Sequence, residues 1–260
     1  MPEMAARLKL LIVPVVFLAL VAAWELLTLH PASRFTLWPA PSVILTNIWD
    51  ERDLFIPAVA TTLWEAFLGF VVGVFLALLT GALSLRFRLL SDFAYRTSVV
   101  LYAVPVITIA PILNIWFGQT LTPKIIIASL GAFFPVTANT LLGLRSANRT
   151  ALEMMEVLGA SRRQTLQYVR IPFALPLVLA SFKIAAPAAL IGAMISEWSG
   201  ATQGLGIMLI YSMFDYLLPR LWGTLLIASL LSVLAYSLFD LAARVMLPWS
   251  ASMQRRGAVR

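Results

Sequence analysis

The stretch Glu153–Pro176 reads EMMEVLGASRRQTLQYVRIPFALP and separates two strongly apolar segments of the chain. One glycine, Gly159, divides it into two parts that each carry charged and polar side chains. Two prolines, Pro172 and Pro176, stand at its end, where the next apolar segment begins. A polar insertion of this kind needs a structural explanation, and that explanation depends on the segments around it.

The composition is typical of an integral membrane protein. Of the 260 residues, 61% are hydrophobic and 12% are charged, whereas soluble domains are about half apolar and about a quarter charged. The net charge is +7, but the basic residues cluster in loops beside apolar segments, so they indicate membrane topology rather than nucleic-acid binding. The absence of cysteine excludes disulfides and thiolate metal sites. The single histidine, His30, argues against a zinc site or a proton relay.

A helix needs about 20 residues to cross ~30 Å of hydrocarbon. By this criterion the chain has six apolar segments long enough to span a membrane. We therefore predict an all-α membrane protein with one domain spanning residues 1–260 and a core at roughly 61–248. The third segment is interrupted by Pro105 and Pro111. The six predicted spans are Leu10–Leu29, Thr61–Leu83, Ser98–Phe117, Lys124–Leu144, Pro172–Glu197 and Leu221–Arg244.

The distribution of Lys and Arg predicts the orientation. With the N-terminus inside, fourteen basic residues fall on the cytoplasmic side and four on the outer side, and Lys183 lies within a span. Cytoplasmic loops carry the excess of basic residues, so both termini are expected in the cytoplasm. The opening stretch then belongs to the longest cytoplasmic loop, at about 145–171. The four outer basic residues are Arg34, Arg52, Lys124 and Arg220.

The first part of this loop has the pattern of a short capped helix. Thr150 and Glu153 have the spacing of a capping box, in which Thr150 caps and Glu153 reaches back to the start of the helix. The helix would run to about Leu158, with Leu152, Met155 and Leu158 on one face. Gly159 can take the left-handed conformation that ends a helix.

The second part has the pattern of another helix, which leads into the fifth span. Ser161 and Gln164 form a second capping box, and Pro172 and Pro176 are expected to set the turn into the membrane. The first helix would be about 12 Å long, and its apolar stripe needs a partner. That partner is either the end of its own bundle or another protein, and the pattern alone leaves both open.

Charged side chains within and just after the fifth span are candidate functional residues. Lys183, about three turns into the fifth span, could attract an anion, snorkel to the inner surface or pair with a carboxylate. Glu197 and Trp198 precede GATQGLG, whose Gly204 and Gly206 suit a sharp bend or a short gate helix. They could line a gate, or they could be an interfacial Trp anchor beside a solvated Glu.

Two further patterns concern packing. Trp38–Asp53 has the apolar spacing of a short helix along the outer interface, although a plain loop is an alternative. Small residues at Gly69 and Gly73, and at Ala185, Ala189 and Ala193, permit close helix contact, either within the chain or at a dimer seam.

The loop resembles the coupling-loop motif of ABC importer permeases, which reads Glu-Ala-Ala, three residues, Gly, nine residues, Ile, one residue, Leu-Pro. Glu153 and Gly159 match this motif, and Ile171–Pro176 matches a common variant of its end. Met154 and Met155 replace the two alanines. The stretches Ala110–Gly118, Thr122–Ser146 and Ile195–Gly206 are similar to the nitrate, sulfonate and taurine branch of these permeases, which also contains pyrimidine-precursor importers. The resemblance covers roughly Thr61 to Pro248.

This resemblance implies a type I importer permease in the inner membrane, working as a pair that is expected to be a homodimer. Each copy docks on one subunit of a cytoplasmic ATPase dimer, and an extracytoplasmic binding protein delivers the solute, which is either an anion or a pyrimidine-like or vitamin-precursor-like molecule. The chain contains no G-x-x-x-x-G-K-[ST] loop, so it is not expected to be an enzyme, and ATP and Mg²⁺ would bind the partner. The resemblance assigns coupling to Glu153, Met154, Met155, Glu156, Leu158, Gly159, Ala160 and Ser161.

Other classes of membrane protein fit less well. A membrane enzyme would need paired intramembrane acids or a metal-binding motif, and neither pattern is found in the sequence. A secondary carrier usually has two halves with matching broken helices. The transmembrane subunit of an energy-coupling-factor vitamin importer is the closest alternative, but its characteristic Ala-Arg-Gly-type motifs are absent.

Overall fold

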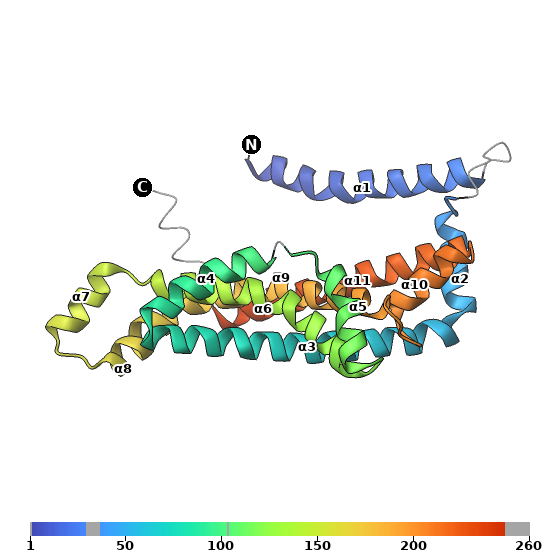
Figure 1. Ribbon diagram of the computed structural model, residues 1–260. Coiled ribbons are helices and arrows are strands. Elements are labelled where there is room, and N and C mark those ends of the chain that lie inside the picture. Colours follow the sequence, from blue (N-terminus) through green and yellow to red (C-terminus); the bar gives the residue numbers. More distant parts are fainter. Residues whose placement is uncertain (1, 30–36, 103, 248–260) are drawn as a thin grey trace.

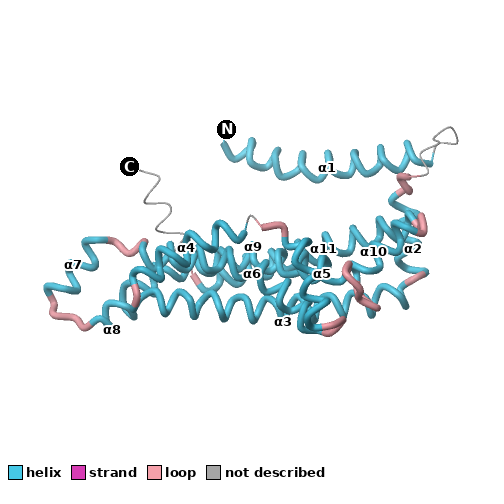
Figure 2. Tube along the Cα trace, in the orientation of Figure 1, coloured by secondary structure: helices cyan, strands magenta, loops and turns pink. Residues whose placement is uncertain are grey.

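The centre of the bundle is a pair of closely packed helices, α6 and α9. The computed structural model describes residues 2–29, 37–102 and 104–247, and within these ranges all regular secondary structure is helical. The helices form an elongated bundle with α7 and α8 at one end and α2 and α10 near the other (Figures 1 and 2). The helices are α1 (Pro2–Leu29), α2 (Pro41–Asp50), α3 (Arg52–Arg86), α4 (Arg88–Tyr102), α5 (Val106–Phe117), α6 (Leu121–Arg145), α7 (Arg149–Val157), α8 (Arg162–Thr165), α9 (Ile171–Glu197), α10 (Leu205–Phe214) and α11 (Leu218–Met246).

Four helical stretches are long and apolar enough to cross a membrane, namely α3, α6, Arg162–Glu197 and α11. They contain four of the six predicted spans, which are confirmed. The first predicted span, Leu10–Leu29, lies within α1. His30 lies outside the described residues. The helix α3 has 35 residues and is about 52 Å long, so it extends well beyond a hydrocarbon core of ~30 Å.

The third predicted span, Ser98–Phe117, is wrong as a single helix. The chain forms α4 up to Tyr102 and a separate helix α5 from Val106, with Pro105 as the residue before α5. Proline lacks a backbone N–H and restricts the residue before it, so a helix usually ends there. The helix α4 also begins ten residues before the predicted span, and its Asp92 forms an ion pair of 2.5 Å with Arg145 of α6. This contact draws a polar stretch into the bundle.

Small residues bring α3 and α6 into close contact. A Cβ atom on Gly69 would overlap Ala128, and a Cβ on Gly73 would lie 2.5 Å from the carbonyl oxygen of Ser129. Ala185 and Ala189 of α9 are fully buried in the adjoining core. The small-residue patterns therefore serve packing within one chain, as in many membrane bundles.

Helix α1 stands away from the bundle for most of its length (Figure 1). It contacts the rest near its C-terminal end, where the rings of Trp24 and Trp222 lie 5.5 Å apart. The carboxylate of Glu25 also accepts hydrogen bonds from the backbone N–H of Ser42 (3.0 Å) and its hydroxyl (2.5 Å) at the start of α2. The predicted helix within Trp38–Asp53 is confirmed as α2, and the alternative of a plain loop is wrong.

The corner between α2 and α3 is tied to α11 by a bidentate ion pair. Arg220 donates to the two carboxylate oxygens of Glu51 at 2.5 and 2.8 Å. This hydrogen bonding lowers the pKa of Glu51, which lies between the two helices. The carboxylate therefore stays charged at a pH where it would take up a proton in the unfolded chain.

We expect Glu51→Gln to reduce stability near neutral pH by roughly 1 kcal/mol, as for a partly exposed ion pair. Because the folded-state pKa of Glu51 is lowered, its contribution is present above the unfolded-state pKa and is lost as the pH falls through the folded-state value. Melting temperatures of wild type and variant should converge on acidification. The exposed Asp50→Asn serves as the control, and a gap of constant size at every pH would contradict the assignment.

Candidate functional site

Two sites follow from the sequence, and the structure places them at opposite ends of the bundle (Figure 1). The first is the projecting unit formed by α7, the turn at Gly159 and α8, which we call the peg (residues 149–165). The second lies around the C-terminal end of α9 and the N-terminal end of α10. Lys183 lies between these two sites, about halfway along α9.

The peg begins two residues before the predicted position. The side chain of Asn148 caps α7 by accepting a hydrogen bond from the N–H of Thr150 at 3.0 Å. Glu153 does not reach back to the cap but pairs with Arg149 at 3.0 Å, one turn away. The predicted Thr150–Glu153 capping box is therefore wrong. Asn is as good an N-cap as Thr, and the earlier start permits an (i, i+4) ion pair on the helix.

The apolar side chains of α7 divide between two faces. Leu152 and Met155 are half-buried. Met154, Val157 and Leu158 are 63%, 88% and 67% exposed, and their spacing places them on one face. The predicted stripe of Leu152, Met155 and Leu158 is thus wrong for Leu158, which belongs to the exposed group. Leu152 therefore borders a cleft toward the bundle, whereas the face of Met154, Val157 and Leu158 is left uncovered by the described residues.

Gly159 ends α7 in the predicted left-handed conformation, with φ of +66°. The N–H of Gly159 donates to the backbone carbonyl of Glu156 at 2.9 Å, and the N–H of Ala160 donates to the backbone carbonyl of Met155 at 2.9 Å. This is the paired bonding of a Schellman motif. A Cβ atom at Gly159 would meet nothing within 4 Å, so the backbone conformation, and not lack of space, requires glycine here.

The second arm of the peg continues directly into the membrane helix. Ser161 and Gln164 form the predicted capping box, with bonds of 3.3 and 2.7 Å. The predicted turn at Pro172 is wrong, because α8 passes through a π-helical turn at Leu166–Arg170 into α9. Pro172 has no N–H and would crowd the carbonyl four residues back, and a π turn of this kind changes the local hydrogen-bond register. The second arm of the peg, α8, and α9 therefore form one continuous helical stretch, Arg162–Glu197.

A cleft of about 1080 Å³ separates the peg from the bundle. Leu152 and Glu156 of α7 line its outer wall, and α3, α4 and α6 contribute the opposite wall. Arg162 and Arg163 are exposed side chains on its border. The lining is rich in arginine and includes Arg86, Arg145, Arg162, Arg163 and Arg170.

Lys183 of α9 forms an ion pair with Asp240 of α11. Asp240 also accepts from Arg244 at 2.7 Å. The sequence left three interpretations of Lys183 open: attraction of an anion, snorkelling to the inner surface, and pairing with a carboxylate. The structure confirms the pairing. Its charge is neutralised within the chain, as is usual for ionisable groups in membrane spans.

Glu197 is fully buried and connects α3, α9 and α10. Its carboxylate accepts a hydrogen bond from the hydroxyl of Thr62 at 2.6 Å and another from the N–H of Gly206. Thr62 in turn accepts from the N–H of Leu205 at 2.8 Å. Gly204 has φ of +134°, and a Cβ atom on it would overlap this carboxyl group. The interpretation of Glu197 as a solvated side chain is therefore wrong, and the predicted short helix is α10, which begins at Leu205 between the two glycines.

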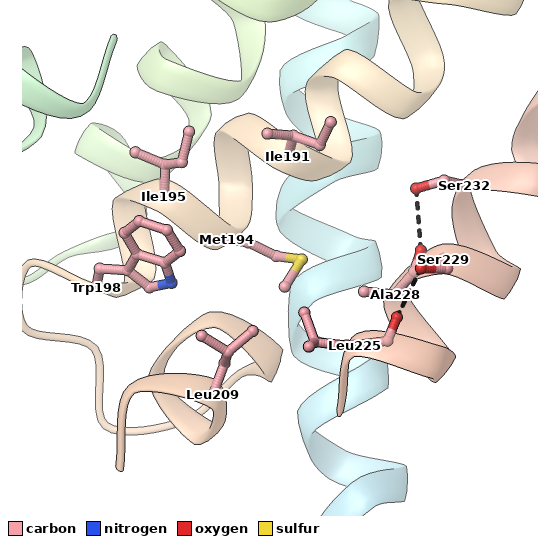
Figure 3. A pocket seen from close by; sticks show the side chains of 9 residues that line it. All are labelled: Ile191, Met194, Ile195, Trp198, Leu209, Leu225, Ala228, Ser229 and Ser232. Atoms are coloured by element: carbon pink, nitrogen blue, oxygen red, sulfur yellow. Dashed lines mark hydrogen bonds between the residues drawn. The ribbon is translucent and has the colours of Figure 1, made fainter. Parts of the chain in front are cut away.

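Trp198 lines a small apolar pocket between α9, α10 and α11 (Figure 3). The pocket measures about 320 Å³. Met194 and Leu209 point into it from α9 and α10, and Ser229 and Ser232 come from α11 (Figure 3). The two hydroxyls donate to carbonyls of their own helix at 2.7 and 2.9 Å, so the pocket presents mainly hydrocarbon.

Sequence reasoning missed the partners of Glu197. Glu65 of α3 is only 2% exposed and forms an ion pair of 2.5 Å with Lys124. Lys124 was expected at the outer end of the fourth span, and it lies in α6 with its side chain mostly buried. The available signal was the position of Glu65, an acid within an apolar span, because such residues are rare and are usually paired.

The sequence matches the family described as "Binding-protein-dependent transport system inner membrane component" over residues 69–250. The chain belongs to this family. It is a multi-pass membrane permease of a binding-protein-dependent ABC importer, as the predicted coupling-loop motif indicates. A permease of this class works with an ATPase and a solute-binding protein. The alternatives of an energy-coupling-factor subunit and a secondary carrier are not supported.

Curated relatives cover most of the chain. The chain is 32% identical to the formylaminopyrimidine transport permease ThiX of Halalkalibacterium halodurans, over 90% of this chain and 93% of the relative. It is 30% identical to the riboflavin transport permease RibX of Chloroflexus aurantiacus, over 92% and 90%. It is 27% identical to the putative aliphatic sulfonates permease SsuC of Bacillus subtilis, over 95% and 89%. These relatives confirm the predicted branch.

Solved structures support the fold. The MetNI methionine ABC transporter in an inward-facing conformation has a chain that superposes with a TM-score of 0.62 at 19% identity, covering 75% of this chain and 97% of that one. An amino acid ABC transporter crystallised with histidines gives a TM-score of 0.63 at 18% identity, with coverage of 76% and 97%. The predicted type I permease bundle is therefore confirmed.

Proposed function

We propose that the peg is the surface through which a separate ATPase drives this permease. The observation that supports it most directly is the exposed apolar face of Met154, Val157 and Leu158, which no part of the described chain covers. An exposed apolar patch surrounded by charged residues is typical of a protein interface. Glu153, Met155, Glu156, Gly159, Ala160 and Ser161 complete the proposed coupling surface.

The helical connection of the peg supports its role in transmission. The capping box at Ser161 and the Schellman motif at Gly159 hold the two arms at a defined angle. Since α8 continues into α9, a displacement of the peg moves α9. The far end of α9 carries Glu197, which is bonded to α10, so this end moves as well. ATP-driven closure of the ATPase pair would thus rock one membrane bundle against its copy, which is a rigid-body transition between two states.

The assembly that follows has two copies of this chain, two ATPase subunits and one extracytoplasmic binding protein. The basic residues of the peg and the cleft support a cytoplasmic location for this end of the bundle, with both termini on the same side. The binding protein would then meet the opposite end, near α2 and α10. ATP and Mg²⁺ would bind the ATPase, and this chain would have no catalytic role or cofactor.

A charge-matched pair of variants tests the coupling surface. Val157→Glu places a charge in the exposed apolar face, so binding of the ATPase subunit should weaken by about 2 kcal/mol, or roughly 30-fold. Val157 is 88% exposed, so the melting temperature of the permease alone should stay unchanged. Gln167→Glu adds the same charge at an exposed position outside α7 and should leave binding intact. Equal co-purification of the ATPase with both variants would refute the proposal.

We further propose that the solute is a small uncharged heterocycle rather than an anion. Two lysines of the spanning helices, Lys124 and Lys183, are each neutralised by a carboxylate, and the pocket at Trp198 is apolar. Relatives named for formylaminopyrimidine and for riboflavin agree with this class. Uptake by cells producing the whole importer should be seen with one of these two compounds, and uptake of taurine or an alkanesulfonate instead would overturn it.

A further inference from the structure

A buried ionic cluster near the N-terminal end of α10 contains two carboxyl groups and one cation. Glu65 and Glu197 are 2% and 0% exposed, and Lys124 is the cation beside them. Tyr211 of α10 is 58% exposed, and Arg220 of α11 is bound to Glu51. Lys124 is therefore the only charged partner that the described residues supply to these two carboxyl groups.

The hydrogen bonds of the cluster leave one oxygen without a partner. Lys124 donates to Oε1 of Glu65 at 2.5 Å. Oε2 of Glu65 is buried and has no hydrogen-bond partner among the described residues. Glu65 lies one helical turn beyond Thr62 on α3, and the hydroxyl of Thr62 donates to the carboxyl of Glu197 at 2.6 Å, so the two buried carboxyl groups lie on the same side of α3. Two ionised carboxylates in this buried region would share a single ammonium group, that of Lys124.

A proton resolves this arrangement. Two carboxylates sharing a buried site do not both ionise, because the repulsion of like charges adds to the cost of removing them from water. With a proton on Glu197, its O–H donates to Oε2 of Glu65, the orphan oxygen is satisfied, and the Lys124–Glu65 pair is electrically neutral. Glu197 still accepts from Thr62 and from the N–H of Gly206.

We propose that Glu65 and Glu197 form a proton-binding site that holds one shared proton near neutral pH. The site connects α3 to the first turn of α10 through Thr62 and Gly206, so the bound proton is part of the contact that fixes α10 on the bundle. Its ligand is a proton taken from solvent. The proposal does not depend on the coupling role of the peg.

Infrared spectroscopy of the purified full-length permease in lipid nanodiscs tests the proposal, because a protonated carboxylic acid has its own carbonyl band that shifts in D₂O. The wild type should show a band that is lost in Glu197→Gln and equally lost in Glu65→Gln, since either change leaves one carboxylate for Lys124. Glu153→Gln on the exposed peg is the control and should leave the band unchanged. Retention of the band in both buried variants, or its absence from the wild type, would overturn the proposal.

Two more variants separate a shared proton from simple misfolding. Glu197→Gln keeps the size of the side chain but loses one of the two acceptor oxygens used by Thr62 and Gly206, so its melting temperature should fall, and size-exclusion chromatography checks that the variant is folded before its spectrum is compared. Lys124→Met removes the cation, and the cluster should then bind a second proton and raise the band intensity about twofold. A site that held a sodium ion instead would show no carboxylic acid band and a melting temperature that rises with NaCl but not with choline chloride, and this result would also overturn the proposal.

Discussion

Replacing Gly159 by valine is expected to abolish ATP-driven transport while leaving membrane insertion intact. The residue has φ of +66°, a conformation that costs a residue with a Cβ atom about 1–2 kcal/mol and is especially unfavourable for β-branched side chains. The turn would relax to another geometry and change the angle between α7 and α8. The exposed face of Met154, Val157 and Leu158 would then point away from its proposed partner.

Asparagine at the same position provides the control. Asn adopts the left-handed conformation more readily than other non-glycine residues, and a Cβ atom there meets nothing within 4 Å. Gly159→Asn should therefore keep most of the ATPase binding and transport that Gly159→Val loses. The measurement is co-purification of the ATPase and uptake by the complete importer. Equal activity of the two variants would show that the angle of the peg does not control coupling.

Replacing Asp240 by asparagine is expected to destabilise the bundle more than any single change at Lys183. Asp240 is the shared partner of Lys183 and Arg244, so its removal leaves the Lys183 ammonium without a carboxylate in a partly buried position between α9 and α11. Breaking such a pair from one side leaves the remaining charge uncompensated, so the melting temperature should fall measurably. Lys183→Met costs less, because Asp240 then keeps Arg244.

Thermal unfolding of the purified permease measures this difference. The double variant Lys183→Met/Asp240→Leu should recover much of the stability lost in Asp240→Asn, because it removes both buried charges together. Uptake by the Lys183→Met variant should persist, since the Lys183 charge is used within the chain. Complete loss of uptake in a Lys183→Met variant that folds normally would instead favour an anion-binding role for this lysine.

Local signals predicted the peg well. Gly159 and the Ser161–Gln164 capping box act over a few residues, and the structure has both as expected. The start of α7 was less certain, because Asn148 and Thr150 are both good N-caps and the choice depends on the Arg149–Glu153 pair. The break at Pro105 was visible as a proline within an apolar run, but only the packing of α4 on α6 shows that the preceding helix includes polar residues.

The sequence by itself determined that this chain is an all-α membrane protein with a projecting peg, because apolar length, the positions of Lys and Arg, and helix caps are properties of short segments. Its resemblance to ABC importer permeases supplied the function. The tertiary structure alone decided the partners of the buried charges. Lys183 meets Asp240 across 57 positions and Lys124 meets Glu65 across 59, while Glu197 meets Thr62 across 135. Such contacts depend on which faces of distant helices pack together, and in a bilayer that packing is set by small residues such as Gly69 and Gly73, whose spacing does not name the helix that they contact.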